Sequence, residues 1–189
     1  TLNESTALSP QNTPQAIFNT DHRQAEKYFT EAAKAGIPEA QYELAELLRR
    51  REVSERDPAA ARKWMREAAF SGIVDAQFRI GVANWSGIGG KVDQREAVRW
   101  LCRAAEGGSA KAAAMLAGFL MTGNGLAYSP ARAWALFMRA AKMGSENAAA
   151  TAKILERQLS LQEKRVQRSL LRIKDSKTFI EKLIPPAER

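Results

Sequence analysis

Apolar residues recur along this chain with the spacing of one helix face. In the stretch before residue 72 they stand at Ala61, Trp64, Met65, Ala68 and Ala69. Positions i, i+3, i+4, i+7 and i+8 lie on the same side of an α-helix, so the stretch predicts a helix that buries this side. The paired alanines leave room for a neighbouring backbone to approach closely.

The same motif is written four times. Its copies begin at Ala25, Ala61, Ala97 and Ala133, so each starts 36 residues after the previous one. A fixed period of this length is typical of stacked helical repeats, in which each unit contacts its neighbours. The period predicts an all-α fold, a right-handed α-solenoid of antiparallel helix hairpins.

Helix start and stop signals recur at the same step. Each first helix should follow a residue whose side chain caps the N-terminus, at Asp21, Asp57, Asp93 and Ser129, and should begin near residues 22, 58, 94 and 130. Each should end at a glycine that can adopt the left-handed conformation, at Gly36, Gly72, Gly108 and Gly144. A second helix is expected after each glycine, over residues 38–50, 74–86, 110–122 and 146–159. Turns this short between helices predict antiparallel hairpins.

The largest side chain of each first helix occupies one repeated position. It is Tyr28, Trp64, Trp100 and then Leu136. We expect this position to be buried in every repeat, because it lies on the apolar face.

The two ends of the chain differ from the repeats. Residues 1–20 contain two prolines and many small polar residues, which predicts a mobile N-terminal arm whose Ile17 and Phe18 approach the first helix. Ser160 and Glu163 fit a capping box that starts a further helix. The apolar stripe of this helix is Val166, Leu170, Ile173, Ile180 and Ile184. The chain thus divides into an arm (1–20), a repeat array (21–159), and a C-terminal capping helix with a basic tail (160–189), with a weaker break at Asp175.

Composition narrows the possible partners. The net charge is +8, and residues 151–189 carry ten Lys or Arg against five Asp or Glu. Such an excess favours acidic partners: a protein surface, anionic lipid or nucleic acid. No stretch reaches the roughly 18 apolar residues of a membrane span, so none is expected.

One full repeat carries a recognisable family pattern. Residues 57–93 read DPAAARKWMREAAFSGIVDAQFRIGVANWSGIGGKVD. This order of Asp, Arg-Lys-Trp, Ala-Ala, Gly, Ala-Gln and a Gly-x-Gly loop resembles the Sel1-like repeat family, which is related to the tetratricopeptide repeats, and the resemblance covers about Asp21 to Ala152. The chain departs from the family at Asn84, where an aromatic residue is favoured, in its first loop, which lacks glycine, and in its fourth unit, which lacks the ring and the second loop.

The resemblance implies a function and a binding face. The family is largely bacterial, is often exported, and serves in interaction, adaptor and regulatory roles, so a periplasmic or secreted location is expected, with the cytoplasm as the alternative. The helix after each glycine would line the concave face. By position, the expected partner-binding residues are Glu39, Tyr42, Glu46, Arg49, Asp75, Phe78, Val82, Trp85, Lys111, Met121, Asn147 and Arg157.

Catalytic and metal chemistry are poorly supported by the sequence. The single histidine, His22, has no nucleophile placed beside it by any motif. The single cysteine, Cys102, occupies the position held by Thr30, Arg66 and Met138 in the other repeats, which predicts a semi-exposed, ordinary thiol. One histidine and one cysteine cannot build a usual zinc site. The residues 86–90 lack the spacing of a phosphate-binding loop. We therefore expect no enzyme activity, cofactor or metal.

Three features allow two interpretations each. Trp85, near Phe78 and Val82, is either a hot spot of the groove or packs on its own loop or the next helix. The basic run at residues 49–51 and the basic tail either bind nucleic acid or lipid or are solvated helix ends. The heptad spacing of Leu159 and the apolar residues after it indicates either capping or a coiled coil.

The sequence therefore predicts a monomeric, non-enzymatic scaffold that holds a protein or peptide of acidic character on its concave face. The alternative is a basic module that binds nucleic acid or an anionic envelope polymer. A salt titration separates the two, because a phosphate clamp is screened more strongly than an aromatic groove.

Overall fold

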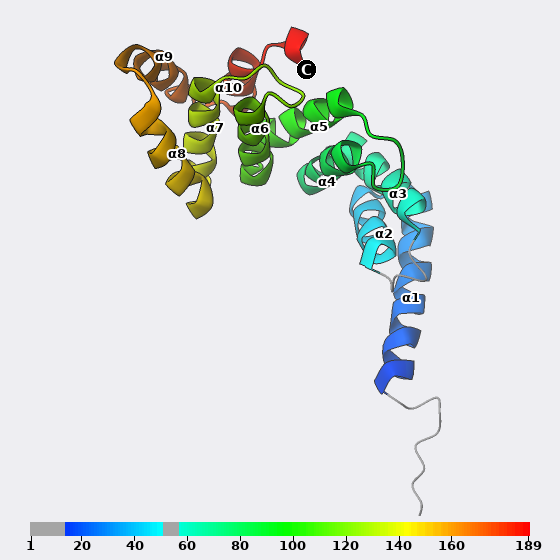
Figure 1. The fold of residues 1–189 in the computed structure, drawn as a ribbon. Coiled ribbons are helices and arrows are strands. Elements are labelled where there is room, and N and C mark those ends of the chain that lie inside the picture. The colour runs from blue at the N-terminus through cyan, green and yellow to red at the C-terminus, as the bar shows by residue number, and fades with distance from the viewer. Residues whose placement is uncertain (1–13, 51–56) are drawn as a thin grey trace, which may run out of the picture.

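The computed structural model describes residues 14–50 and 57–189, with side chains from residue 24 onward. The regular elements of these residues are helices, arranged as a curved array in Figure 1. They are α1 Pro14–Lys34, α2 Pro38–Arg50, α3 Pro58–Phe70, α4 Val74–Ser86, α5 Gln94–Glu106, α6 Ala110–Thr122, α7 Pro130–Lys142, α8 Glu146–Gln158, α9 Leu161–Leu171, α10 Ser176–Leu183 and a final 3-10 turn, Pro186–Glu188.

The sequence signals set the helix boundaries of the array from α3 onward. The Asp57 carboxylate accepts from the Ala60 N–H at 2.9 Å, and Asp93 and Ser129 cap α5 and α7 in the same way. Gly72 and Gly108 end their helices with φ of +96° and +93°, the left-handed region that glycine favours. The second helices lie where the repeat predicts them.

From α1 to α8 each helix packs against the next one along the chain, and the hairpins stack into an α-solenoid. In Figure 1 the array bends, with α4 and α6 on the inner side of the bend and α3 and α5 on the outer side. The largest apolar cluster runs through α5, α6, α7 and α8 and on to α10. Neighbouring repeats therefore share one core, as the period predicts.

The N-terminal boundary differs from the prediction. Helix α1 begins at Pro14 and not near residue 22, so Asp21 lies inside the helix and does not cap it. The backbone of residues 14–20, expected to belong to the arm, is helical. The remaining arm residues 1–13, the side chains of Ile17, Phe18 and His22, and the first loop at 51–56 lie outside the described residues.

The repeated aromatic position is not buried in every repeat. Trp100 is 1% exposed and Leu136 is buried, as expected, but Tyr28 is 68% exposed and Trp64 is half-buried. Trp100 packs among residues of the preceding hairpin, including Met65. In the first repeat no hairpin precedes α1 within the described residues to receive the corresponding ring, which explains why Tyr28 reaches solvent.

The C-terminal segment forms two helices rather than one. The expected capping box opens α9, where Ser160 and Glu163 bond reciprocally, and Asp175 caps α10 at the predicted weaker break. The expected stripe is not continuous, since Val166 is 52% exposed whereas Ile180 and Ile184 are buried. Two short helices can turn relative to each other, so α9 covers α7 while α10 reaches back to α5.

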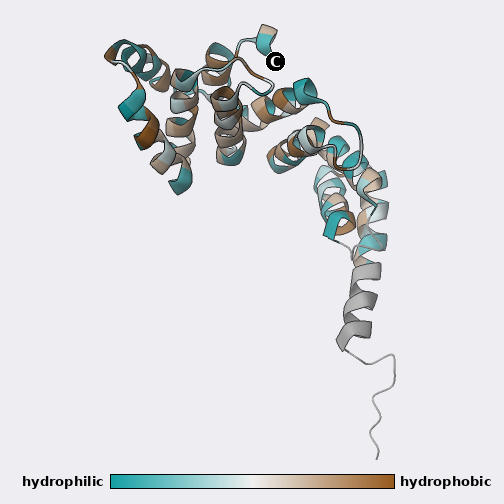
Figure 2. Cartoon of the chain, viewed as in Figure 1, coloured by the Kyte–Doolittle hydropathy of each residue, from teal (hydrophilic) through white to brown (hydrophobic). Residues whose placement is uncertain are grey.

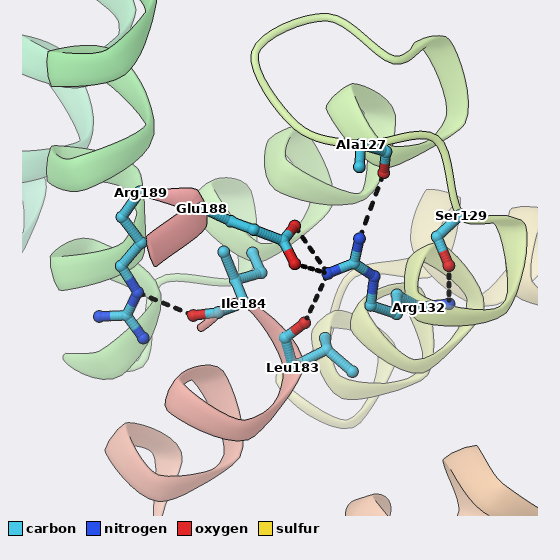
Figure 3. A network of polar contacts seen from close by, with 7 residues as sticks. All are labelled: Ala127, Ser129, Arg132, Leu183, Ile184, Glu188 and Arg189. Carbon is cyan, nitrogen blue, oxygen red and sulfur yellow. Dashed lines mark hydrogen bonds and ion pairs between the residues drawn. The ribbon is translucent and has the colours of Figure 1, made fainter. Parts of the chain in front are cut away.

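Two arginines of α7 hold this returning segment, residues 173–189. The Arg139 guanidinium donates to the carbonyl oxygens of Ile173 at 2.8 Å and Lys174 at 2.7 Å, between α9 and α10. Figure 3 shows Arg132 bonded to the Leu183 carbonyl oxygen and to the Glu188 carboxylate at 2.8 Å. The segment is thereby fastened at both ends, and the cap extends past the last hairpin.

Candidate partner-binding surface

A stripe of partly exposed apolar positions follows the inner helices. Phe78 and Val82 of α4 are half-buried, and residues 36 and 72 positions later occupy the matching places on α6 and α8. These are Ala114 and Gly118 on α6, and Ala150 and Ile154 on α8. Ile154 is 60% exposed. In Figure 2 the ribbon of α6 is mostly on the apolar side of the scale.

Gly118 sits in the middle of this stripe. It lies in the interior of α6 without a left-handed backbone, and a Cβ atom added to it meets no described atom within 4 Å. Glycine in a helix interior costs about 1 kcal/mol relative to alanine. Neither turn geometry nor internal packing requires a glycine here, while its absent side chain opens space above the helix.

Eleven of the twelve residues expected on the concave face fall into two groups by exposure. Tyr42, Phe78, Val82, Trp85 and Met121 are half-buried. The other group is exposed and polar: Glu39, Arg49, Asp75, Lys111, Asn147 and Arg157.

Glu46 is a correction to the expected site, because it is 2% exposed and cannot serve as an open contact residue. Its carboxylate pairs with Arg49 at 2.9 Å, Arg50 at 3.3 Å and Arg79 at 3.0 Å. Burial raises the pKa of Glu46, but the hydrogen bond from Arg49 and the neighbouring guanidinium charges outweigh it, so this pKa lies below its ordinary value. Glu46 joins α2 to α4.

Trp85 packs on the next repeat. Its ring stacks on Phe119 of α6 with centroids 4.0 Å apart and an interplanar angle of 26°. Phe78, Trp85 and Met121 also lie against the main apolar cluster. Trp85 is thus part of the contact between hairpins, the second of the two interpretations that the sequence allows.

The corresponding contact between the first two repeats is open. A cavity of about 460 Å³ lies among α2, α3, α4 and the loop after α4. The described residues that line it are Leu48, Arg49, Pro58, Ala61, Arg62, Met65, Arg79, Ala83 and Ile88.

Arg62 shapes one wall of this cavity. Its guanidinium donates to the Asn84 side-chain oxygen and to the carbonyl oxygens of Ile88 and Lys91. Burial lowers the pKa of Arg62, as does the charge of Arg66, while Asp93 offsets part of the shift. Arg62 fixes the glycine loop against α3 and satisfies the side-chain oxygen of the buried Asn84, where the family favours an aromatic ring, while the Asn84 amide nitrogen has no partner among the described residues.

Cys102 is a second correction, since it is fully buried and not semi-exposed. Burial raises the pKa of its thiol to about 12. The charge of Arg189 lowers this pKa and the charge of Glu106 raises it, both by less than burial does. The cause is the returning C-terminal segment: α10 packs on α5, and Arg189 binds Glu106 at 2.8 Å. The first, second and fourth repeats have partly or fully exposed residues at this position.

The described part of the chain shows no group of three or more His, Cys, Asp or Glu side chains placed to hold a metal ion. Within the same residues, no helix combines the length and the apolar character needed to cross a bilayer.

Sequence reasoning missed four members of the apolar stripe. Ala114, Gly118, Ala150 and Ile154 lie on the same faces as the residues it named. The 36-residue step contains the signal that finds them, because adding it to Phe78 gives Ala114 and adding it to Val82 gives Gly118.

The Sel1 repeat model matches residues 10–37, 38–70, 74–109 and 110–145, which is well over half of the chain. The chain belongs to the Sel1 repeat family. The matched ranges pair α2 with α3, α4 with α5 and α6 with α7. Sel1 repeats are non-catalytic modules of protein–protein interaction.

Two solved structures share the fold. A Sel1 repeat protein from Oxalobacter formigenes superimposes with a TM-score of 0.63 at 22% identity, over 91% of this chain and 90% of that one. The protein c5321, a protective antigen of uropathogenic Escherichia coli strains with an SLR fold, gives 0.57 at 24% identity over 86% of this chain but 42% of its own length. No match was found among curated proteins.

Proposed function

We propose that this Sel1 repeat chain is a scaffold that holds a segment of a partner protein against the apolar stripe on α4, α6 and α8. The observation that carries the proposal is Gly118. A helix-interior glycine that faces open space is unfavourable for the isolated chain. It is useful where the backbone of a bound segment approaches the helix closely.

The residues around Gly118 support the same function. Ala114 and Ala150 place only small side chains at the positions that match Phe78, while Phe78 and Ile154 lie at the two ends of the stripe. Exposed charges at the helix starts, such as Asp75 and Lys111, form a polar border. An apolar centre with a polar rim is the usual anatomy of a protein interface.

The experiment selects short peptides from a random phage library against the wild-type chain and then measures their affinity for two variants. Gly118→Gln places a side chain on the apolar stripe. Because glutamine has the higher helix propensity, we expect the free energy of unfolding to rise by about 0.5–1 kcal/mol. Peptide affinity should fall at least tenfold.

The matched control is Ala59→Gln, which adds the same side chain at an exposed position of α3, on the outer side of the bend. It should leave peptide affinity unchanged. Equal affinities for wild type and Gly118→Gln would contradict the proposed binding face.

A further inference from the structure

The cavity between the first two repeats occupies the place that an aromatic pair fills between the next two. Moving 36 residues along the chain takes Arg49 to Trp85, Ala83 to Phe119 and Arg79 to Met115. In the contact between the second and third repeats, the two rings of Trp85 and Phe119 stack on each other. In the first contact two large rings are replaced by an arginine and an alanine, which accounts for the space of about 460 Å³.

The walls of the cavity are mainly apolar. Leu48, Ala61, Met65 and Ala83 contribute aliphatic or thioether surface from α2, α3 and α4. Its volume lies within the range of roughly 300–1,000 Å³ that ligand-binding pockets occupy. An aromatic side chain therefore fits this cavity in size and polarity, as aromatic rings do at the matching place in the next repeat.

The rim of the cavity carries unbalanced positive charge. Among the described residues, Arg49, Arg50 and Arg79 share the single carboxylate of Glu46, so three guanidinium groups of this part of the chain face one acid. Arg79 binds Glu46 through Nε. Its two terminal nitrogens can therefore donate hydrogen bonds to further acceptors. The arginine side chains are 36–70% exposed, so a carboxylate from outside can reach them.

We infer that this cavity is an anchoring pocket for an aromatic side chain of the partner segment, flanked in that segment by carboxylate side chains that bind Arg49 and Arg79. The inference rests on the proposed function and specifies the partner's chemistry: an acidic segment with one buried ring. The ring restores the packing that the first contact lacks, and the acids neutralise the excess charge at the rim.

Three matched peptides test the inference on the full chain by amide chemical-shift titration. The first is acetyl-Gly-Asp-Trp-Glu-Gly-amide. The second replaces both acids by their amides, and the third replaces Trp by Ala. We expect the first peptide to shift resonances of Ala61, Ala83 and Ile88, and its affinity to exceed that of either other peptide at least tenfold.

The decisive variant is Ala83→Phe, which puts into the first contact the ring that Phe119 supplies in the second. It should fill the pocket from within, keep the wild-type melting temperature or raise it, and abolish the shifts. Gln162→Phe adds the same ring at an exposed position of α9, outside both the apolar stripe and the cavity, and serves as the control that leaves binding of the acidic peptide unchanged.

Other outcomes overturn the inference. Equal affinity for the acidic and amide peptides would remove the role of the arginines. Unchanged binding to Ala83→Phe would place the ring elsewhere. A lowered melting temperature of Ala83→Phe together with no peptide binding to wild type would mean that the cavity does not accept a ring from a partner. If Gly118→Gln still blocks binding of the library peptides in these cases, the proposed scaffold function is retained and only the anchoring pocket is rejected.

Discussion

Cys102 illustrates how one residue's chemistry depends on a distant part of the chain. In the other repeats its position is at least partly open, whereas here the returning segment packs on the helix that carries it. A thiol with a pKa of about 12 is almost entirely protonated at neutral pH. The same cysteine would be an ordinary, reactive thiol on a chain without α10.

We expect native protein to resist modification by a disulfide reagent near neutral pH, and protein unfolded in denaturant to react at once. Arg139→Ala removes the bonds that hold residues 173–176, so it should increase the modification rate several-fold without loss of the far-ultraviolet helix signal. Arg99→Ala, an exposed arginine of α5 that pairs with Glu96, is the control. Rapid modification of the wild type would show that Cys102 is not enclosed.

Glu46 gives stability a defined pH dependence. Its folded-state pKa lies below the ordinary value of 4.5, so its contribution is fully present above that value and is lost as the pH falls through the folded-state pKa. Glu46→Gln should lower the free energy of unfolding by about 1–2 kcal/mol near neutral pH.

The difference between wild type and Glu46→Gln should shrink once the pH falls well below 4.5. Denaturant melts across this range measure it, with the exposed Glu43→Gln as the control on the same helix. A difference that stays constant through the acid range would mean that the ionised carboxylate is not what joins α2 to α4.

At the scale of single elements, the glycines that end the first helices are the strongest local constraint. At Gly72 and Gly108 an added Cβ meets no described neighbour within 4 Å, so the positive φ alone is the obstacle. Gly72→Val and Gly108→Val should each lower the free energy of unfolding by about 1–2 kcal/mol or more. Gly118→Ala, at a helical glycine, should instead raise it, and thermal melts that show no loss for the valine variants would contradict the assigned helix ends.

The elements that local signals define were predictable from the sequence. Asp93 and Gly108 stand where a cap and a terminator are needed, and the resulting helix follows without knowledge of its neighbours. What the sequence could not give depends on packing across the chain. The enclosure of Cys102 requires the turn between α9 and α10. The burial of Glu46 requires Arg79 from the next repeat, and the exposure of Tyr28 follows from its place at the end of the array.

At the scale of the whole molecule, stacking has two consequences. Repeats in the middle of the array share a core with their neighbours, so Trp100 and Leu136 are buried. The first contact is less well filled than the second, because Arg49 and Ala83 replace the rings of Trp85 and Phe119. The array therefore has a tight C-terminal half, closed by residues 173–189, and a more open N-terminal contact beside the apolar stripe.

The most direct test of the account is a hydrogen-exchange footprint of the full chain with and without a peptide selected from the random library. Backbone amides of α4, α6 and α8 should exchange more slowly in the complex, while those of α5 on the outer side should be unaffected. Protection confined to α3, α5 or the basic C-terminal segment would contradict the claim that the inner apolar stripe holds the partner.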